Sequence, residues 1–345
     1  MKVKVYDEVA KVIFNIIDKD LFKDRVVFKA EMNKIRESKG IKLMLDFYKA
    51  FDFETYEEVL YISLNDSDYD TENETLKMMN ANLRRIVKDN YSVKAKMSSI
   101  KTYDFSTLEK RLVDKLPEGT EVDVEIYFVF DGINGGSIVE NNKMLLNTML
   151  WPSNEENLHL IEGILLHEYH HIGLLHWLNK YDKNFNDYSD SAGLAKYLML
   201  SIMSEGAATY FYNDGDDIYP LVVESHGEET AFSIREAMRN RGSNIENYMN
   251  ELELDLIDIL NYQENINELR PLINKYTFSS TGEPLDKSVG YHMCSVIEEE
   301  LGLESLIECF KNPNDFVFKY NDALKENDKL GFSEAFIRAW TSLVS

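Results

Sequence analysis

The sequence predicts an α+β fold that is predominantly helical, with one small sheet. Apolar residues recur at helical spacing through most of the 345 residues, and the spacing changes to alternation only within 122–130. The chain is long enough to bury one large core or two smaller ones. We expect three regions: a mostly helical region 1–118, a region 119–215 with the sheet and two long helices, and a helical region 216–345.

The first region shows helical patterns. The chain starts MKVKVYDEVAKVIFNIIDKD, in which Val5, Val9, Ile13 and Ile16 lie between charged residues, and this spacing predicts an amphipathic helix. Further helices are expected at 55–64 and 74–88, with a weaker one near 105–116.

The second region begins with the sheet. In 122–130 (VDVEIYFVF), apolar residues alternate with other residues, which predicts a half-buried strand. The following DGINGG has the composition of a turn, and 137–150 can supply one or two more strands.

The remaining chain is almost wholly helical, with the longest apolar helices expected at 154–178, 193–212 and 289–310. Ser153 and Glu156 form a capping box that predicts the start of the first of these. If one continuous helix carries Cys294 and Cys309, its rise holds them about 22 Å apart, too far for a disulfide. We therefore expect reduced thiols.

The charge balance limits the partners. The formal net charge is −24, which repels phosphate backbones and anionic membrane surfaces, so nucleic acid is not an expected partner. The sequence contains no run of eighteen apolar residues, so no membrane span is predicted. Because the start is amphipathic rather than an uninterrupted apolar segment, we expect a cytoplasmic protein.

The residues most suggestive of chemistry are His167-Glu168-Tyr169-His170-His171, an HExxH motif. On a helix, His167 and His171 are about 40° apart around the axis and one turn apart along it, so their imidazoles can converge on one ion. Glu168 lies on the adjacent flank, beside the place of a metal-activated water. Chance alone would produce roughly 0.014 such matches in a chain of this composition. The motif predicts a Zn²⁺ site.

Catalytic zinc usually has three protein ligands, so a third must come from elsewhere. The extended form HExxHxxGxxH fails by one position, because Gly173 and His176 have the required spacing from His170 and not from His171. Glu205 is the better candidate, since it is the acidic residue of an apolar helix and would be costly to bury without a cation. We expect the small residues after it to let this helix approach the HExxH helix closely. The alternative is a surface glutamate at a helix break made by Gly206.

These residues resemble the gluzincin metallopeptidases, which carry HExxH on one helix and a glutamate ligand on a later one. The sequence is most similar to a bacterial group of predicted zinc-dependent peptidases, through His167 to His171, Glu205-Gly206-Ala207 and Gly290-Tyr291 over residues 120–310. The resemblance implies a zincin-like fold whose sheet packs on the HExxH helix and whose C-terminal helices complete the cleft.

The resemblance also implies roles for individual residues. His167, His171 and Glu205 would bind zinc, Glu168 would be the general base, and the strand pair would bind an extended peptide or protein substrate. The sequence departs from better-known gluzincins at Thr209, where an acidic partner for a histidine ligand is expected.

The leading hypothesis is therefore peptide hydrolysis, in which a second donor stabilises the oxyanion. The candidates for that donor are Tyr291 and His292, in the segment SVGYHMC. Two alternatives stay open: a non-catalytic zinc-binding or scaffold protein, and a zinc amidase that acts on a non-peptide substrate. Amidases of the deformylase type have a cysteine ligand upstream of HExxH, whereas both cysteines here lie downstream.

Overall fold

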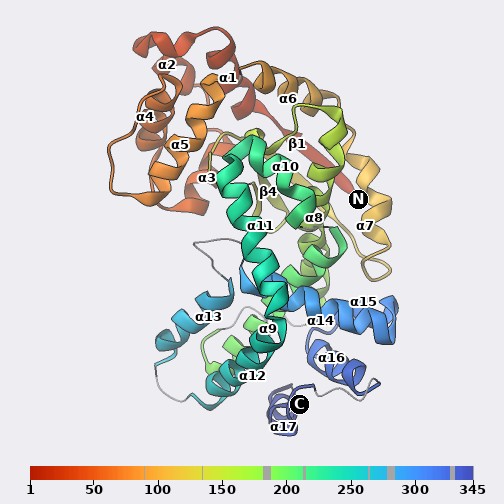
Figure 1. Cartoon of the computed structure of the whole chain (residues 1–345). Coiled ribbons are helices and arrows are strands. Elements are labelled where there is room, and N and C mark those ends of the chain that lie inside the picture. Colours follow the sequence, from red (N-terminus) through yellow and green to blue (C-terminus); the bar gives the residue numbers. More distant parts are fainter. Residues whose placement is uncertain are drawn as a thin grey trace. The chain divides into compact units, whose positions relative to one another are not determined.

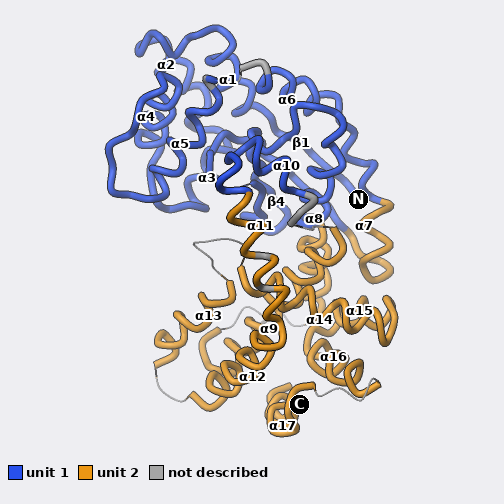
Figure 2. Tube along the Cα trace, viewed as in Figure 1, with its two compact units in different colours: residues 1–109, 122–168, 218–231 blue, residues 110–121, 169–217, 232–345 orange. Residues whose placement is uncertain are grey.

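The computed structural model describes residues 1–88, 90–133, 135–181, 188–212, 215–262, 265–277, 284–326 and 331–344. The described chain is predominantly helical with one four-stranded mixed sheet, which confirms the expected α+β class. It divides into two compact units (Figure 2). Unit 1 comprises residues 1–109, 122–168 and 218–231, and unit 2 comprises residues 110–121, 169–217 and 232–345. The expected domains 1–118, 119–215 and 216–345 stay a prediction.

Unit 1 contains the whole sheet (Figure 1). Its strands are β1 (Lys2–Tyr6), β2 (Asp123–Val129), β3 (Gly136–Glu140) and β4 (Lys143–Asn147). They lie in the order β1-β2-β4-β3, with β1/β2 and β2/β4 parallel and β3 antiparallel to β4. Strand β3 therefore forms one edge of the sheet.

Unit 1 also contains several helices, the last of them only from residue 218 onward. They are α1 (Glu8–Asp18), α2 (Arg25–Met32), α3 (Lys39–Tyr48), α4 (Phe53–Leu64), α5 (Glu74–Lys88), α6 (Asn90–Thr102) and α10 (Gly215–His226). Helix α8 (Leu158–Tyr181) begins in unit 1 and continues into unit 2. The helices expected at 55–64 and 74–88 are confirmed as α4 and α5.

The start of the chain differs from the expected single helix. Residues 2–6 form β1, and the helix begins only at Glu8. The sequence KVKVY also alternates, and β1 pairs in parallel with β2, with Val3 opposite Val124. Residues 2–6 form a strand because they pair with a strand some 120 residues away in the chain. The prediction of a helix from local periodicity was therefore wrong here.

Strand β2 is more buried than expected. Its residues from Ile126 to Val129 are all buried, because side chains of other elements cover both faces of the sheet here. On one face Tyr127 packs near Gly40 of α3, where an added Cβ would lie 3.7 Å from the ring. On the other face Phe128 meets Trp151 edge-on. The expectation of a half-buried strand was wrong in this half of β2.

The segment before α8 also corrects an expectation. The side chain of Asn154, not that of Ser153, accepts the capping hydrogen bond, from the Asn157 N–H at 3.0 Å. The Ser153 N–H is held instead by Glu224 of α10. Glu224 also pairs with the buried Lys96 at 2.7 Å. Burial would raise the pKa of Glu224, but the Lys96 charge and these hydrogen bonds hold it below its usual range.

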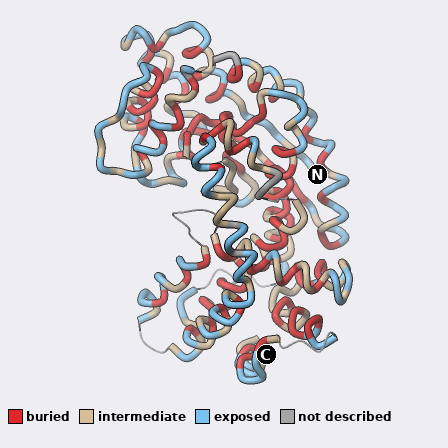
Figure 3. Tube along the Cα trace, viewed as in Figure 1, coloured by how far each residue is buried: buried red, intermediate tan, exposed pale blue. Residues whose placement is uncertain are grey.

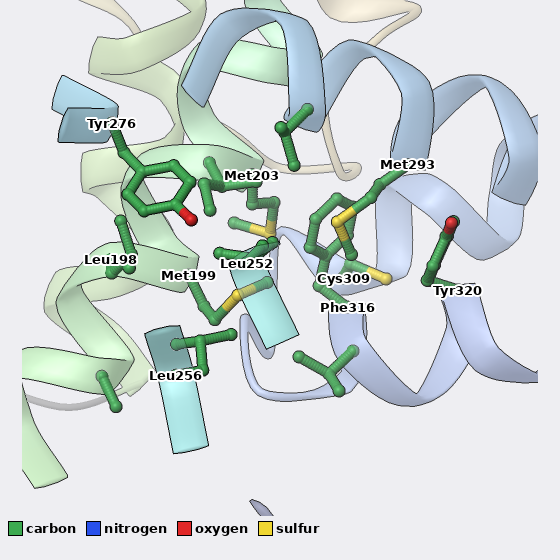
Figure 4. Close-up of a cluster of buried hydrophobic side chains, with 14 of the residues drawn as sticks. Leu198, Met199, Met203, Leu252, Leu256, Tyr276, Met293, Cys309, Phe316 and Tyr320 are labelled. Atoms are coloured by element: carbon green, nitrogen blue, oxygen red, sulfur yellow. The ribbon is translucent and has the colours of Figure 1, made fainter. Parts of the chain in front are cut away.

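Unit 2 contains the remaining helices, and most of them contribute to a hydrophobic core. They are the second part of α8, α7 (Glu109–Val113), α9 (Ser191–Tyr212), most of α11 (Glu228–Ser243), α12 (Ile245–Asn261), α13 (Arg270–Thr277), α14 (Leu285–Leu301), α15 (Leu303–Cys309), α16 (Asp315–Glu326) and α17 (Glu334–Val344). Figure 4 shows the centre of this core, where residues such as Met203, Leu252, Met293 and Phe316 converge. In both units buried and exposed residues alternate along the helices (Figure 3).

The expected helix at 289–310 is broken into α14 and α15. Gly302 between them has φ +82°, a left-handed conformation that glycine adopts without a steric penalty. Cys294 and Cys309 are both free and buried, which confirms the expected thiols. Burial raises the pKa of Cys294 well above its usual value and that of Cys309 to about 12.

In the described part of the chain, no helix combines the length and apolar character that crossing a bilayer requires.

Candidate metal centre

The HExxH motif lies within α8, a helix that is apolar on most of its surface. His167 is 3% exposed, and the His171 side chain is 15% exposed. The helix runs without a break from Leu158 to Tyr181, so the chain does not bend at Gly173 as the extended HExxHxxGxxH motif would require. His176 instead approaches Lys180, with 2.7 Å between their nitrogens. The two motif histidines therefore share one uninterrupted helix face.

His170 points to a different environment. It is fully buried, and its ring meets Phe211, Tyr212 and Phe310 at centroid distances of 5.1 to 5.8 Å. This ring packs among aromatic side chains of unit 2, so it belongs to the core that holds α8 rather than to the face of the motif histidines.

Glu205 of α9 completes a three-residue cluster. Its Oε1 lies 3.3 Å from Nε2 of His171. One ligand atom each from His167, His171 and Glu205 lie within 4.8 Å of one another. Ligand bonds of about 2.0–2.2 Å in a tetrahedron imply ligand atoms roughly 3.3–3.6 Å apart, so the His171–Glu205 distance suits zinc. Two imidazoles and a carboxylate are also a known donor set for catalytic zinc.

A neighbour of Glu205 orients the His171 ring. Nδ1 of His171 lies 2.8 Å from the hydroxyl of Ser204. The ring therefore directs Nδ1 to Ser204 and Nε2 to Glu205. The expected partner position, Thr209, is buried, and its hydroxyl makes no hydrogen bond within the described ranges. Ser204 thus supplies the partner that the sequence lacks at 209, and sequence reasoning missed it.

Glu168 lies beside the sheet edge. Its Oε2 accepts a hydrogen bond from the Ile138 N–H of β3 at 3.2 Å. In the same area, a Cβ added at Gly136 of β3 would lie 3.7 Å from Ile164 of α8. This is an ordinary van der Waals distance, whereas the same Cβ would lie only 2.9 Å from the Met144 side chain of β4, so the hydrogen bond from Ile138 is what links β3 to the carboxylate.

Helix α14 packs against α9 at two glycines. An added Cβ at Gly290 would lie 2.7 Å from Cα of Gly206 and 2.9 Å from the carbonyl carbon of Ile202, so the two backbones touch. We expected the small residues after Glu205 to serve the HExxH helix. For Gly206 this was wrong, because its close neighbour is α14.

The two predicted oxyanion donors lie on α14, on different sides. Tyr291 is 41% exposed and meets the ring of Tyr210 edge-on, with centroids 5.2 Å apart. His292 has Nε2 3.3 Å from the Tyr320 hydroxyl of α16. Their roles as donors stay predictions.

Sequence reasoning also missed two residues at the start of α14. Nζ of Lys287 lies 3.8 Å from Oε2 of Glu205. The Asp286 carboxylate accepts hydrogen bonds from the Ser201 hydroxyl and from the Lys287 N–H, both at 2.8 Å. In the sequence, both residues lie three or four positions before Gly290, and this spacing indicates that they share its helix face.

The charge of Glu205 acts on a second carboxylate of unit 2, that of Asp286. Burial, and then the nearby charge of Glu205, raise the pKa of Asp286 to about 7, although the Ser201 hydrogen bond and the Lys287 charge oppose the rise. A cation bound by Glu205 would lower this repulsion.

The fold and this cluster define a predominantly helical α+β protein with a candidate His-His-Glu metal site. A family model described as "Putative zinc dependent peptidase (DUF5700)" matches residues 32–329, and the chain belongs to this family. The match extends beyond the expected 120–310 at both ends and includes most of the N-terminal helices. No curated protein and no solved structure matches the chain.

Proposed function

We propose that the chain is a gluzincin-type zinc peptidase, in which His167, His171 and Glu205 hold zinc and Glu168 is the general base. The observation that carries the proposal is that ligand atoms of His167 and His171, on the helix that also bears Glu168, lie within 4.8 Å of one another and of a carboxylate oxygen of Glu205 on α9. Membership of a family described as zinc-dependent peptidases supports the same chemistry. The proposal includes a zincin-like arrangement, since β3 lies against α8.

The chain's own residues prepare the metal site. Bound zinc would acidify a water molecule and polarise the carbonyl group of a peptide bond. His167 and His171 would coordinate as neutral imidazoles, and Ser204 holds the His171 ring in the required orientation. Glu205 would add one negative charge to the site.

Glu168 would carry the proton. Its carboxylate would accept a proton from the attacking water as the water oxygen bonds to the carbonyl carbon. It would then deliver this proton to the leaving amine nitrogen as the C–N bond breaks. The hydrogen bond from the Ile138 N–H keeps the carboxylate in one orientation between the two steps.

The substrate in this proposal is a peptide or protein segment in extended form. Strand β3 is a sheet edge, and the outer backbone groups of an edge strand can pair with such a segment. Because Glu168 bonds to this same strand, a peptide on β3 would lie close to the general base. Tyr291 and His292 remain the proposed oxyanion donors.

The test of the proposal is Glu168→Gln. This change keeps the size of the side chain and removes its basicity, so zinc should remain near one ion per chain while peptide hydrolysis falls about 10²- to 10⁴-fold. Metal content is measured on purified protein, and hydrolysis is measured by mass spectrometry of a peptide-library digest with and without a chelator. The matched control is Glu155→Gln, an exposed residue just before α8 that should change neither quantity.

The same experiment separates the alternatives. If wild-type protein binds zinc and cleaves no peptide, a non-catalytic zinc protein or an amidase for a non-peptide substrate replaces the peptidase. If Glu168→Gln cleaves peptides at the wild-type rate, Glu168 is not the base.

A further inference from the structure

The two carboxylate oxygens of Glu205 face different partners. Oε1 lies 3.3 Å from Nε2 of His171, on the side of the candidate ligands. Oε2 lies 3.8 Å from Nζ of Lys287, within ion-pair distance. All three side chains belong to unit 2, and all three are partly buried, with exposures of 15%, 29% and 22% for His171, Glu205 and Lys287. The carboxylate is thus presented with one oxygen towards His171 and the other towards a cation.

The backbone around Lys287 is held in place by α9. The neighbouring Asp286 binds the Ser201 hydroxyl, which lies one helical turn before Glu205. One turn after Asp286, Gly290 touches Gly206, the residue after Glu205. One of these contacts precedes Lys287 on α14 and the other follows it, and both are made with α9. Together they fix the position of the Lys287 Cα relative to Glu205.

We propose that Lys287 is a positioning residue that makes Glu205 a one-oxygen ligand. This inference rests on the proposed function, because it assumes that Glu205 binds zinc. A carboxylate that binds through both oxygens would occupy an additional coordination position, which the catalytic water needs. By attracting Oε2, Lys287 keeps that position open. Partners of this kind around metal ligands commonly change metal affinity by 10- to 100-fold when they are removed.

Charge alone makes the opposite prediction for affinity. Removing a positive charge near the site lowers the repulsion of an incoming cation and would tighten zinc binding. Loss of a positioning contact weakens binding and changes the coordination number. The two effects can therefore be told apart in one variant, provided that coordination is observed directly.

The experiment uses the full-length protein with zinc or cobalt ions as probes. Lys287→Met removes the charge and retains a flexible side chain, whereas Lys287→Arg retains the charge. Zinc affinity is measured by competition with a chromophoric chelator, and the visible absorption of the Co²⁺-loaded protein reports coordination number, because four-coordinate Co²⁺ absorbs more strongly than five- or six-coordinate Co²⁺. The matched control is Lys196→Met on α9.

We expect Lys287→Met to bind zinc at least about tenfold more weakly and to show weaker, shifted cobalt bands. Lys287→Arg should restore the bands towards those of wild type, and Lys196→Met should match wild type. A Lys287→Met protein with wild-type cobalt bands overturns the inference, even if its zinc affinity rises or its hydrolysis falls, because Lys287 then acts through charge or on the substrate. If wild-type protein binds no zinc, the proposed function fails first, so the two failures are distinguishable.

Discussion

At the scale of single residues, the candidate site depends on how each imidazole is turned. His171 has one nitrogen near Ser204 and the other near Glu205, two consecutive residues of α9. The hydrogen bond between Nδ1 and the Ser204 hydroxyl restricts rotation of the ring, and with a metal on Nε2 the Nδ1–H would donate to that hydroxyl. One turn of α9 thus provides both a candidate ligand and the group that orients a second ligand.

This arrangement predicts the effect of Ser204→Ala. Without the hydroxyl, the His171 ring loses its orienting partner, and zinc affinity should fall about 10- to 100-fold. The measurement is chelator competition on the purified variant. Ser191→Ala, at the start of the same helix, serves as the control and should keep wild-type affinity. Equal affinities for Ser204→Ala and wild type would show that the hydroxyl does not orient the ligand.

The local spacing of residues in the sequence was sufficient to predict the two candidate histidine ligands. It was insufficient to predict which residues surround them. His167 and His171 lie on one face because helix geometry alone brings residues four apart together. Glu205 could be proposed because an isolated carboxylate in an apolar helix requires a cation. Lys287 lies 82 positions further along the chain, and contacts between α9 and α14, such as that of Gly206 with Gly290, bring it to Glu205. No local pattern encodes such a contact.

At the scale of elements, the pairing of α9 with α14 positions the residues next to Glu205. These helices touch backbone to backbone, and α14 carries Asp286, Lys287 and the proposed donor Tyr291. The elements assigned wrongly from sequence show the same dependence on distant partners or on single backbone angles. Strand β1 exists because it pairs with β2, and α14 ends at Gly302 because its φ is positive. Long apolar helices such as α5 and α9 were predictable because their periodicity is local.

The α9–α14 contact predicts that Gly290→Ala is destabilising. The added methyl group would lie 2.7 Å from Cα of Gly206, and backbone atoms cannot move aside as a flexible side chain can. We expect a loss of about 1–3 kcal/mol in the free energy of unfolding, measured by urea denaturation. The control is Gly242→Ala in α11, where an added Cβ meets nothing within 4 Å. There the higher helix propensity of alanine should stabilise the protein slightly. A Gly290→Ala protein as stable as wild type would contradict the close contact.

At the scale of the whole molecule, the family assignment covers more of the chain than the recognisable motifs do. The family model covers residues 32–329, so it includes elements of both compact units as well as the candidate site. Sequence resemblance alone suggested residues 120–310, because the recognisable motifs lie only there. The helices of residues 32–119 carry no metal-ligand spacing, and their inclusion in the family could not be inferred from the chemistry of their side chains.

Zinc binding should stabilise the whole chain by mass action. The proposed ligands come from two helices, so an unfolded chain cannot present them together, and zinc at 100 times its Kd should add about 2.7 kcal/mol to the free energy of unfolding. Each further tenfold increase in zinc adds about 1.4 kcal/mol, and a chelator removes the gain. Thermal unfolding across a zinc series measures this slope. His171→Ala should abolish it, whereas His159→Ala, an exposed residue of α8, should preserve it. If His171→Ala and wild type respond equally, zinc acts elsewhere on the chain.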